Sequence, residues 1–149
     1  MRAIIQRVSS ASLHIDGHLH ATISQGFVIL LGIHVEDTEA DVDYLVGKIQ
    51  GLRIFSDAEG KMNLSLEQVS GQLLLVSQFT LYADTRKGNR PSYLASARPE
   101  QAIPLYNSTI HKLELAMGFP IQTGEFGADM QVSLCNDGPV TIILDSKNK

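Results

Sequence analysis

Four consecutive aliphatic residues, Leu73 to Val76, precede the polar residues Ser77, Gln78 and Thr80 with no Gly or Pro between them. An apolar run of this kind predicts a strand that is buried on both faces. Polar side chains at the end of such a strand need partners, which a cleft supplies as water, a ligand or another chain. Taken alone, the pattern is more typical of hydroxyl groups that only bond to the neighbouring main chain.

The first third of the chain is predicted to be mostly β. Residues 1–8 alternate between apolar and polar side chains, and residues 8–16 continue this signal into a second strand. Asp16-Gly17 then predicts a two-residue hairpin turn before a strand over 19–24. Residues 26–33 are predicted to form a fully buried strand.

Two helices are predicted. Thr38 and Asp41 fit a capping box, and apolar residues follow at spacings of three and four. The second helix is predicted from Pro99 or Glu100 to Met117, with Gly118 as its C-terminal cap. The residues expected on its buried face are Ile103, Tyr106, Ile110, Leu113 and Met117, while Pro104 fits only within the first turn or at a kink.

The order of elements predicts an α/β fold made of a single domain, residues 1–149, with mixed or antiparallel sheets. The sheet is expected to be barrel-like or a sandwich, with two main helices packed outside, because the regular alternation of a doubly wound fold is missing. Residues 146–149 form a polar tail that is expected to fray. The remaining predicted segments are strands at 52–55, 121–123, 130–135 and 142–144, and a loop at 62–64.

Composition and charge narrow the class of protein. Hydrophobic residues make up 44% and charged residues 19% of the 149 residues, which is a globular balance. No apolar run approaches the roughly 20 residues that span a bilayer, and the first residues lack a signal pattern, so a cytoplasmic location without a membrane partner is expected. A formal net charge of −4 argues against a DNA or RNA binder driven by bulk charge, although a local patch can still hold an RNA substrate.

The densest basic cluster lies in residues 86–90, shortly after the central strand. Such a cluster is usually a solvated loop. Its position next to the proposed site makes contact with phosphate groups an equally good interpretation. The residues concerned are Arg86, Lys87 and Arg90.

The usual catalytic and metal-binding patterns are missing. Only His18 and His20 are closely spaced among the five histidines, with no third ligand nearby, so no metal site is expected. There is no nucleophile elbow and no Gly-rich phosphate loop, and no cofactor is expected. The single cysteine, Cys135, lies in a strand-like segment and is expected to be a small buried residue.

Gly138-Pro139 lies between two predicted strands, where it is expected to bend the chain sharply. An X-Pro bond is the only peptide bond with a realistic cis population, although an ordinary trans turn is more common. A cis bond would present the carbonyl groups of both residues side by side as rigid acceptors.

Two separated motifs resemble the motif pair of the D-aminoacyl-tRNA deacylases, the D-tyrosyl-tRNA deacylase family. The first is Ser77-Gln78-Phe79-Thr80 and the second is Asn136-Asp137-Gly138-Pro139-Val140-Thr141. The similarity extends over essentially the whole chain, through residues 1–8, 61–63, 87–91 and 123–130. We see no departure from the family at the motif positions.

The resemblance implies a homodimer that hydrolyses the ester bond of D-aminoacyl-tRNA without a metal. In that family the Gly-Pro motif is cis and enters the pocket of the other subunit. Carried over, Gly138 and Pro139 act as the chiral filter: their carbonyl groups occupy the space that an L side chain needs, while a D side chain points to solvent. Achiral glycine is not excluded, so glycyl-tRNA is an expected side substrate.

The resemblance also assigns the walls of the pocket. Main-chain N–H groups near Phe79 and Thr80 can stabilise the developing oxyanion, each contributing about 3 kcal/mol. An aromatic face and a thioether suit a planar adenine base. The wall that holds the ester and the terminal adenosine is Ser77, Gln78, Phe79 and Thr80, and the adenine pocket is Phe126, Gly127 and Met130.

Two mechanisms and two other functions stay open at this point. Thr80 attacks the ester as a nucleophile, or the protein positions substrate and water while the ribose 2′-hydroxyl assists, which the resemblance favours. A non-catalytic tRNA-binding module would use Arg86, Lys87 and Arg90 instead. A purely structural dimer would use Gly138-Pro139 only as an interface turn.

Overall fold

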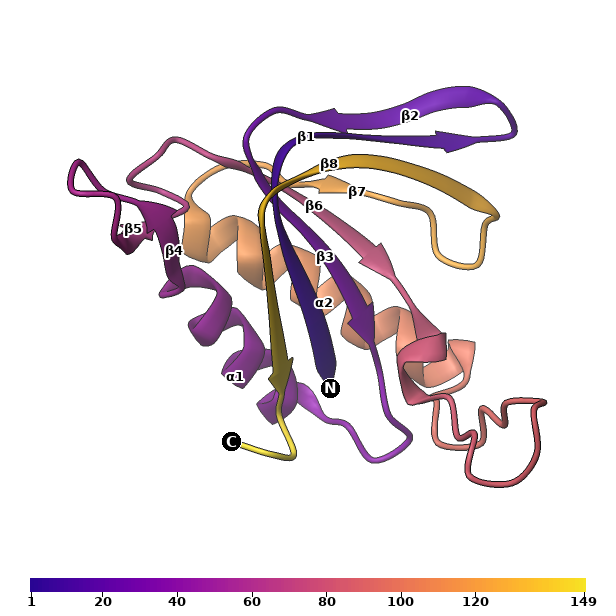
Figure 1. The fold of residues 1–149 in the computed structure, drawn as a ribbon. Helices are drawn as coiled ribbons and strands as arrows, with labels where there is room; N and C mark the ends of the chain where they lie inside the picture. The colour runs from indigo at the N-terminus through magenta and orange to yellow at the C-terminus, as the bar shows by residue number, and fades with distance from the viewer.

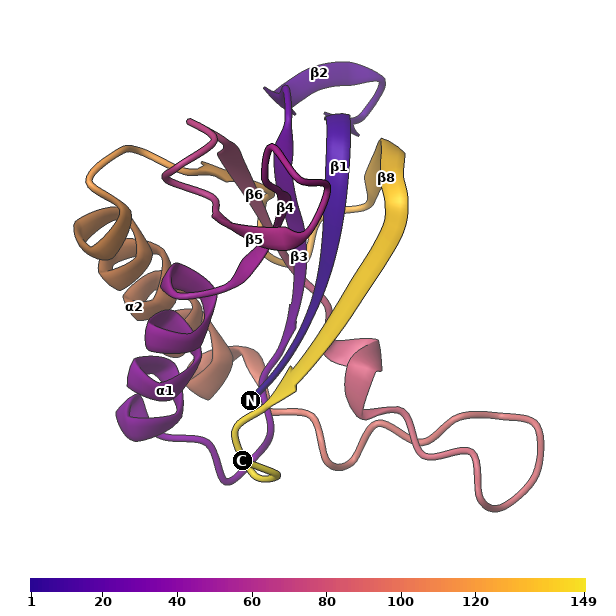
Figure 2. The same ribbon diagram turned by 60° about the vertical axis from the view of Figure 1, so that its left-hand side comes forward.

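A curved sheet forms the body of the protein, and two helices lie side by side against one of its faces (Figures 1 and 2). The computed structural model describes residues 1–149. The strand order in the sheet is β2-β1-β3-β6-β7, and β8 pairs with β1. The strands of this sheet are β1 (Arg2–Ile15), β2 (His18–Ile23), β3 (Gly26–Gly32), β6 (Gln72–Ser77), β7 (Gln122–Thr123) and β8 (Met130–Asp145).

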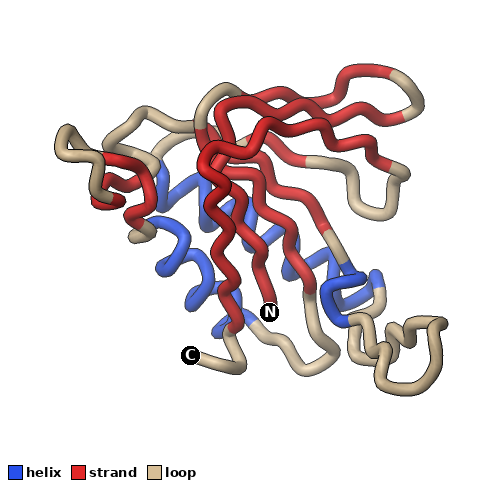
Figure 3. Tube along the Cα trace, in the orientation of Figure 1, coloured by secondary structure: helices blue, strands red, loops and turns tan.

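Two long strands replace four of the predicted ones (Figure 3). β1 is continuous from Arg2 to Ile15: one edge pairs first with β3 and then with β2, and the other edge pairs with β8 along its length. The predictions of a break near Val8 and of separate strands at 130–135 and 142–144 are therefore wrong. Cross-strand pairing extends these elements beyond their locally apolar parts, which a pattern along the chain does not reveal. The hairpin turn at Asp16-Gly17 is confirmed, with φ angles of 51° and 76°.

The prediction that the central strand is buried on both faces is confirmed. β6 runs parallel to β3, from Gly26 opposite Gln72 to Leu31 opposite Ser77. Leu73 and Leu75 face the larger core cluster, which includes residues of both helices. Leu74 and Val76 point to the other face of the sheet and pack into a second cluster with residues of β1 and β2. Each fully buried aliphatic side chain contributes about 1.5–3 kcal/mol, so this strand is held firmly in place.

Helix α1 (Glu39–Gln50) begins as predicted, with a capping box between Thr38 and Asp41. Helix α2 (Pro99–Met117) also has the predicted ends, and Gly118 caps it in the left-handed region. Its buried stripe differs, because Ile103 is 39% exposed and Ile110 is half-buried. The residues that α2 buries are Ala102, Leu105, Tyr106, Thr109, Leu113 and Met117.

The phase of this stripe follows from the position of α2 over the sheet rather than from hydrophobicity alone. Tyr106 reaches β6 and donates a hydrogen bond of 2.9 Å to the carbonyl oxygen of Leu75. Thr109 is fully buried and satisfies its hydroxyl group on the carbonyl oxygen of Leu105. Pro104 lies inside the helix on the exposed side.

Two further segments differ from the expectation. The predicted loop at 62–64 is a strand, β5 (Met62–Ser65), which pairs with β4 (Arg53–Ser56) in a separate hairpin. The start of the C-terminal tail is ordered, because Ser146 is 3% exposed and bonds to the Met1 amino group and to Asp41. Burial raises the pKa of the Asp41 carboxyl, but hydrogen bonds from Ser146, Thr38 and Lys147 outweigh it and leave that pKa well below its ordinary value.

No helix of the chain combines the length and the apolar character that crossing a bilayer requires.

Candidate active site

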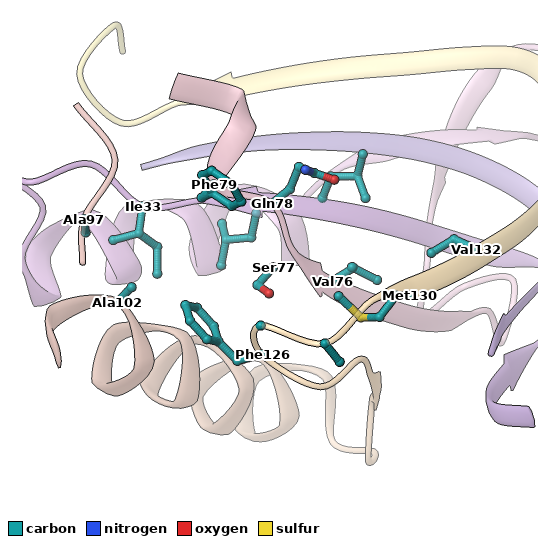
Figure 4. A pocket seen from close by; sticks show the side chains of 14 residues that line it. Ile33, Val76, Ser77, Gln78, Phe79, Ala97, Ala102, Phe126, Met130 and Val132 are labelled. Atoms are coloured by element: carbon teal, nitrogen blue, oxygen red, sulfur yellow. The ribbon is translucent and has the colours of Figure 1, made fainter. Parts of the chain in front are cut away.

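A cavity of about 290 Å³ lies where β6 ends, between the sheet and the first turn of α2 (Figure 4). Eleven of its fourteen lining residues are hydrophobic. An apolar cavity with a few polar groups is typical of a small-ligand site, and its volume lies at the small end of the usual range. The lining residues come from the ends of β3 and β6 and the residues that follow them, from the start of α2, from the segment between β7 and β8, and from the start of β8.

The polar wall of the cavity forms because the chain changes direction at the end of β6. The strand ends at Ser77, the Gln78 N–H bonds to the carbonyl oxygen of Leu31 at 2.7 Å, and a 3-10 turn, η1 (Phe79–Tyr82), follows. Gly32 allows this turn to pack closely on β3, since a Cβ there would lie 3.1 Å from the Gln78 carbonyl oxygen. The turn therefore brings consecutive polar and aromatic residues to the end of a rigid strand.

The structure places three residues of the first motif in the cavity wall: Ser77, Gln78 and Phe79. Ser77 points into the cavity, between Phe79 on one side and Phe126 on the other (Figure 4). Thr80 is not part of the lining, and its hydroxyl oxygen accepts a hydrogen bond from the Gln78 side-chain amide. Phe79 and Thr80 open the 3-10 turn, where main-chain N–H groups have no partner within the turn and can donate to a ligand.

The opposite wall contains all three residues assigned to an adenine pocket: Phe126, Gly127 and Met130. The Phe126 ring packs against the ring of Tyr106, and the two ring centroids are 6.0 Å apart. Burial raises the pKa of the Tyr106 hydroxyl group, so Tyr106 stays protonated and keeps its hydrogen bond to β6. The first motif and the residues assigned to the adenine pocket thus meet across one cavity.

Gly138 and Pro139 lie outside the cavity of their own chain. Both are exposed on β8, and the peptide bond between them is cis. They do not form a turn between two strands, because β8 continues past them: a step of five residues on β8, from Thr141 to Asn136, lies opposite a step of two on β1, from Gln6 to Val8. The predicted connection between two separate strands is therefore wrong: the motif is a bulge on one continuous strand, and a bulge bends its strand, as β8 does along its course in Figure 1.

Arg7 holds this bulge, and the sequence analysis did not single it out. Its side chain is 10% exposed, donates to the carbonyl oxygens of Asp137 and Ile54, and pairs with the Asp137 carboxylate at 3.2 Å. A buried guanidinium group satisfied by three acceptors fixes the main chain next to Gly138. The sequence did contain one signal of this role: Arg7 is a charged residue at a position that the alternation of β1 turns to the same side as the buried Ala3 and Ile5.

The basic loop is separate from the cavity. Arg86 pairs with Asp84 at 2.6 Å and lowers the pKa of that carboxyl to about 2. Lys87 and Arg90 are exposed and take part in none of the ion pairs of residues 1–149. A shallow depression beside the loop is lined by Asp84, Arg86, Lys87 and Ser92.

Cys135 is exposed, so the prediction of a small buried residue is wrong. It lies on β8 at a stretch whose outer side is not covered by any other element, whereas the strand pattern suggested a core position. Over residues 1–149, no three His, Cys, Asp or Glu side chains gather in a way that could hold a metal ion.

Known proteins resemble this chain over its whole length. The model of the D-Tyr-tRNA(Tyr) deacylase family matches residues 4–145. D-aminoacyl-tRNA deacylases of Cytophaga hutchinsonii and Porphyromonas gingivalis are 59% and 56% identical to it over 149 residues, covering 100% of this chain and 99% of each relative.

Two solved structures are also similar. The c-Myc DNA unwinding element binding protein is 41% identical and superposes with a TM-score of 0.90 over 97% of this chain and 98% of that one. A probable eukaryotic D-amino acid tRNA deacylase is 17% identical and superposes with a TM-score of 0.83 over 96% and 97%. The predicted fold class, a mixed α/β domain with a barrel-like sheet and two outer helices, is thereby confirmed. Given the family match and relatives more than half identical in sequence, this chain belongs to the D-Tyr-tRNA(Tyr) deacylase family.

Proposed function

We propose that this chain, as one domain, hydrolyses the ester bond of D-aminoacyl-tRNA and releases free tRNA and the D-amino acid. The observation that carries the proposal is the single cavity that Ser77, Gln78 and Phe79 share with Phe126, Gly127 and Met130. An apolar, aromatic wall suits the terminal adenine, and the polar wall suits the ester. Membership of the family and the names of the relatives support the same reaction.

The chiral filter of this proposal comes from a second copy of the chain. Gly138 and Pro139 lie on the exposed surface, away from the cavity of their own chain. Ile143 on the same strand is 65% exposed. An exposed apolar side chain on this surface supports a homodimer in which each motif enters the partner's cavity. Exclusion by main chain rejects L residues and admits glycine, so glycyl-tRNA is a side substrate.

In the proposed reaction, the protein positions the groups and the substrate supplies the acid-base chemistry. A water oxygen forms a bond to the carbonyl carbon of the ester, and the bond from that carbon to the ribose 3′-oxygen breaks. The neighbouring 2′-hydroxyl group takes up the proton that the attacking water loses and gives its own proton to the departing 3′-oxygen. The N–H groups of Phe79 and Thr80 donate to the developing oxyanion, at about 3 kcal/mol per donor. Holding ester and water in place contributes several kcal/mol more, reaching about 7–11 kcal/mol in the best-oriented cases.

The exposed cations of the basic loop complete the proposal. Lys87 and Arg90 are free to contact phosphate groups of the tRNA, whereas Arg86 must share its charge with Asp84. Their role is to position the tRNA rather than to choose the amino acid.

Hydrolysis of matched substrates tests the function. The purified protein is expected to release tRNA from D-tyrosyl-tRNA at catalytic enzyme concentrations and to leave L-tyrosyl-tRNA intact, as measured by the remaining acid-precipitable labelled amino acid. Retention of tRNA on the protein without release of either amino acid would instead identify a non-catalytic tRNA-binding module. Equal hydrolysis of both substrates would contradict the chiral filter.

The Thr80→Ala variant separates the two mechanisms. Since the Thr80 hydroxyl oxygen is held by the Gln78 amide and no base activates it, kcat is expected to fall by no more than about tenfold. Thr80→Ser keeps the hydroxyl group and serves as the matched control, which is expected to match the unmodified protein. A loss of about a thousandfold or more in Thr80→Ala, restored by Thr80→Ser, would assign Thr80 as the nucleophile.

A further inference from the structure

Two exposed aromatic rings lie at the edge of the cavity, on the side of the basic loop. Phe79 is 56% exposed and Tyr93 is 39% exposed, and their ring centroids are 5.0 Å apart in an edge-to-face arrangement. Phe79 also lines the cavity (Figure 4). Neither ring belongs to the hydrophobic clusters that hold the fold together. A contiguous exposed apolar surface next to a cavity is typical of an interaction site, whereas single exposed apolar residues are common.

The main chain that carries Tyr93 is anchored, although the loop between η1 and α2 projects from the body of the protein (Figures 1 and 2). Ser92 and Asp84 exchange main-chain hydrogen bonds of 2.9 and 2.8 Å across the base of the loop. On the other side, the Ala97 N–H bonds to the carbonyl oxygen of Ile33, and the Ser96 hydroxyl bonds to that of Phe79, both at 2.8 Å. The main chain that carries the two rings is therefore fixed before any ligand binds, which lowers the entropic cost of stacking against them.

The charge around these rings favours a nucleic acid as the occupant. From Asp84 to Ser92 the loop carries Arg86, Lys87 and Arg90 against one carboxylate, Asp84, whereas the whole chain has a net charge of −4. Asp84 is neutralised by Arg86, so the excess charge of the loop rests on the two other cations. The depression beside Ser92 places the Lys87 side chain next to the main chain that leads to Tyr93. Aromatic faces interleaved with cations are the usual platform for single-stranded nucleic acids.

We propose that Phe79 and Tyr93 form a stacking platform for the nucleobase that precedes the terminal adenosine of the tRNA. Lys87 and Arg90 then face the phosphates on the side of this nucleotide that leads away from the cavity. This inference rests on the proposed function, since it assumes that the terminal adenosine occupies the cavity. The single-stranded end of the tRNA then leaves the cavity past Phe79. Stacking tolerates any base, so the platform adds affinity and positions the end of the tRNA without reading its sequence.

A pair of substrates isolates the platform. Tyr93→Ala is expected to raise KM for D-tyrosyl-tRNA at least about fivefold with kcat unchanged, the lower limit of one stacking contact. For 3′-O-D-tyrosyl-adenosine, which lacks the preceding nucleotide, the same variant is expected to match the unmodified protein. Tyr93→Phe keeps the ring and is expected to restore the lower KM. Leu94→Ser is the matched control, because Leu94 is the neighbouring apolar residue and is 89% exposed.

Three results would overturn the platform. The first is an equal effect of Tyr93→Ala on both substrates, and the second is no effect on either. The third is a loss of the dimer in Tyr93→Ala by sedimentation velocity, which would assign the rings to an interface between two copies of the chain. Binding of the trinucleotide CCA by calorimetry separates this inference from the proposed function. If the unmodified protein hydrolyses neither substrate, the proposed function is refuted. In that case, CCA binding by Tyr93→Ala that is at least about fivefold weaker than binding by the unmodified protein still supports the platform, and equal binding by the two proteins refutes it.

Discussion

Replacing Gly138 by Ala is expected to lower the rate of D-aminoacyl-tRNA hydrolysis at least about a hundredfold. Gly138 has a φ of 129°, which L side chains rarely adopt. A Cβ there would lie 3.0 Å from the main-chain nitrogen of Val140 and 3.2 Å from the Arg7 guanidinium group. The main chain must shift to relieve these contacts, and in the proposed dimer the displaced carbonyl groups would no longer match the partner's cavity. Single-turnover hydrolysis of D-tyrosyl-tRNA measures the loss.

Gly60→Ala is the matched control for this substitution. Gly60 has a φ of 79° in the turn between β4 and β5, and nothing lies within 4 Å of a Cβ built there. The strain of a positive φ is thus present without any contact with the motif, and activity is expected to stay within about twofold. Full activity of Gly138→Ala would show that the motif takes no part in the reaction.

Mixing two inactive variants tests whether the site is shared between subunits. Gly138→Ala keeps an intact cavity, whereas Ser77→Phe fills the cavity into which Ser77 points and keeps an intact motif. After subunit exchange, mixed dimers contain one cavity faced by one intact motif. Random assortment is expected to restore roughly a quarter of the normal activity. No recovery in dimers shown to be mixed would rule out a motif that acts on the partner's cavity.

Replacing Gly26 by Ala is expected to destabilise the fold by about 3 kcal/mol or more, the largest stability effect of the predictions made for this protein. A Cβ at Gly26 would overlap the carbonyl oxygen of Gln72 and lie 2.7 and 2.8 Å from its carbonyl carbon and nitrogen. These atoms belong to the first pair of the β3–β6 ladder, so no side-chain rotation can relieve the overlap. We expect the melting temperature to fall by roughly 10 °C, measured by circular dichroism.

Gly47→Ala provides the opposite case within the same protein. Gly47 lies inside α1, is exposed, and has nothing within 4 Å of a Cβ built on it. Alanine is expected to stabilise the protein by about 0.5–1 kcal/mol, because glycine in a helix loses more conformational entropy on folding. If Gly26→Ala melted at the same temperature as the unmodified protein, close packing of β6 on β3 would not be what holds Ser77 in position.

Predictions from the sequence succeeded where the signal is local. The capping box at Thr38 and the left-handed cap at Gly118 are confirmed, because a helix end depends on residues within one turn of it. The buried strand before Ser77 is confirmed for a similar reason, since four aliphatic residues in a row leave no polar face to turn toward water. Of the five residues predicted on the buried face of α2, Tyr106, Leu113 and Met117 are buried, whereas Ile103 and Ile110 are not. The helix turns Ala102 and Leu105 toward the sheet instead of Ile103, and the pattern along the chain does not set this phase.

The candidate site depended on longer-range contacts. The motif around Ser77 and the residues Phe126, Gly127 and Met130 were identified by resemblance, and the structure brings them to one cavity although about 50 residues of chain separate them. Arg7 had no local signal of its role, since its acceptors on Ile54 and Asp137 lie 47 and 130 residues away along the chain. Burial of a guanidinium group is stable only where distant carbonyl groups converge on it.

The amino-acid sequence by itself determined the two helices and their ends, the buried central strands, and the family to which the motifs belong, because these depend on neighbouring residues and on residue type. Only the tertiary structure decided that β1 and β8 run uninterrupted, that Gly138-Pro139 stands on the surface away from its own cavity, and that Arg7 holds it there. Those features arise from pairing between strands at opposite ends of the chain, and hydrogen bonds between such distant residues leave no periodic trace in the sequence.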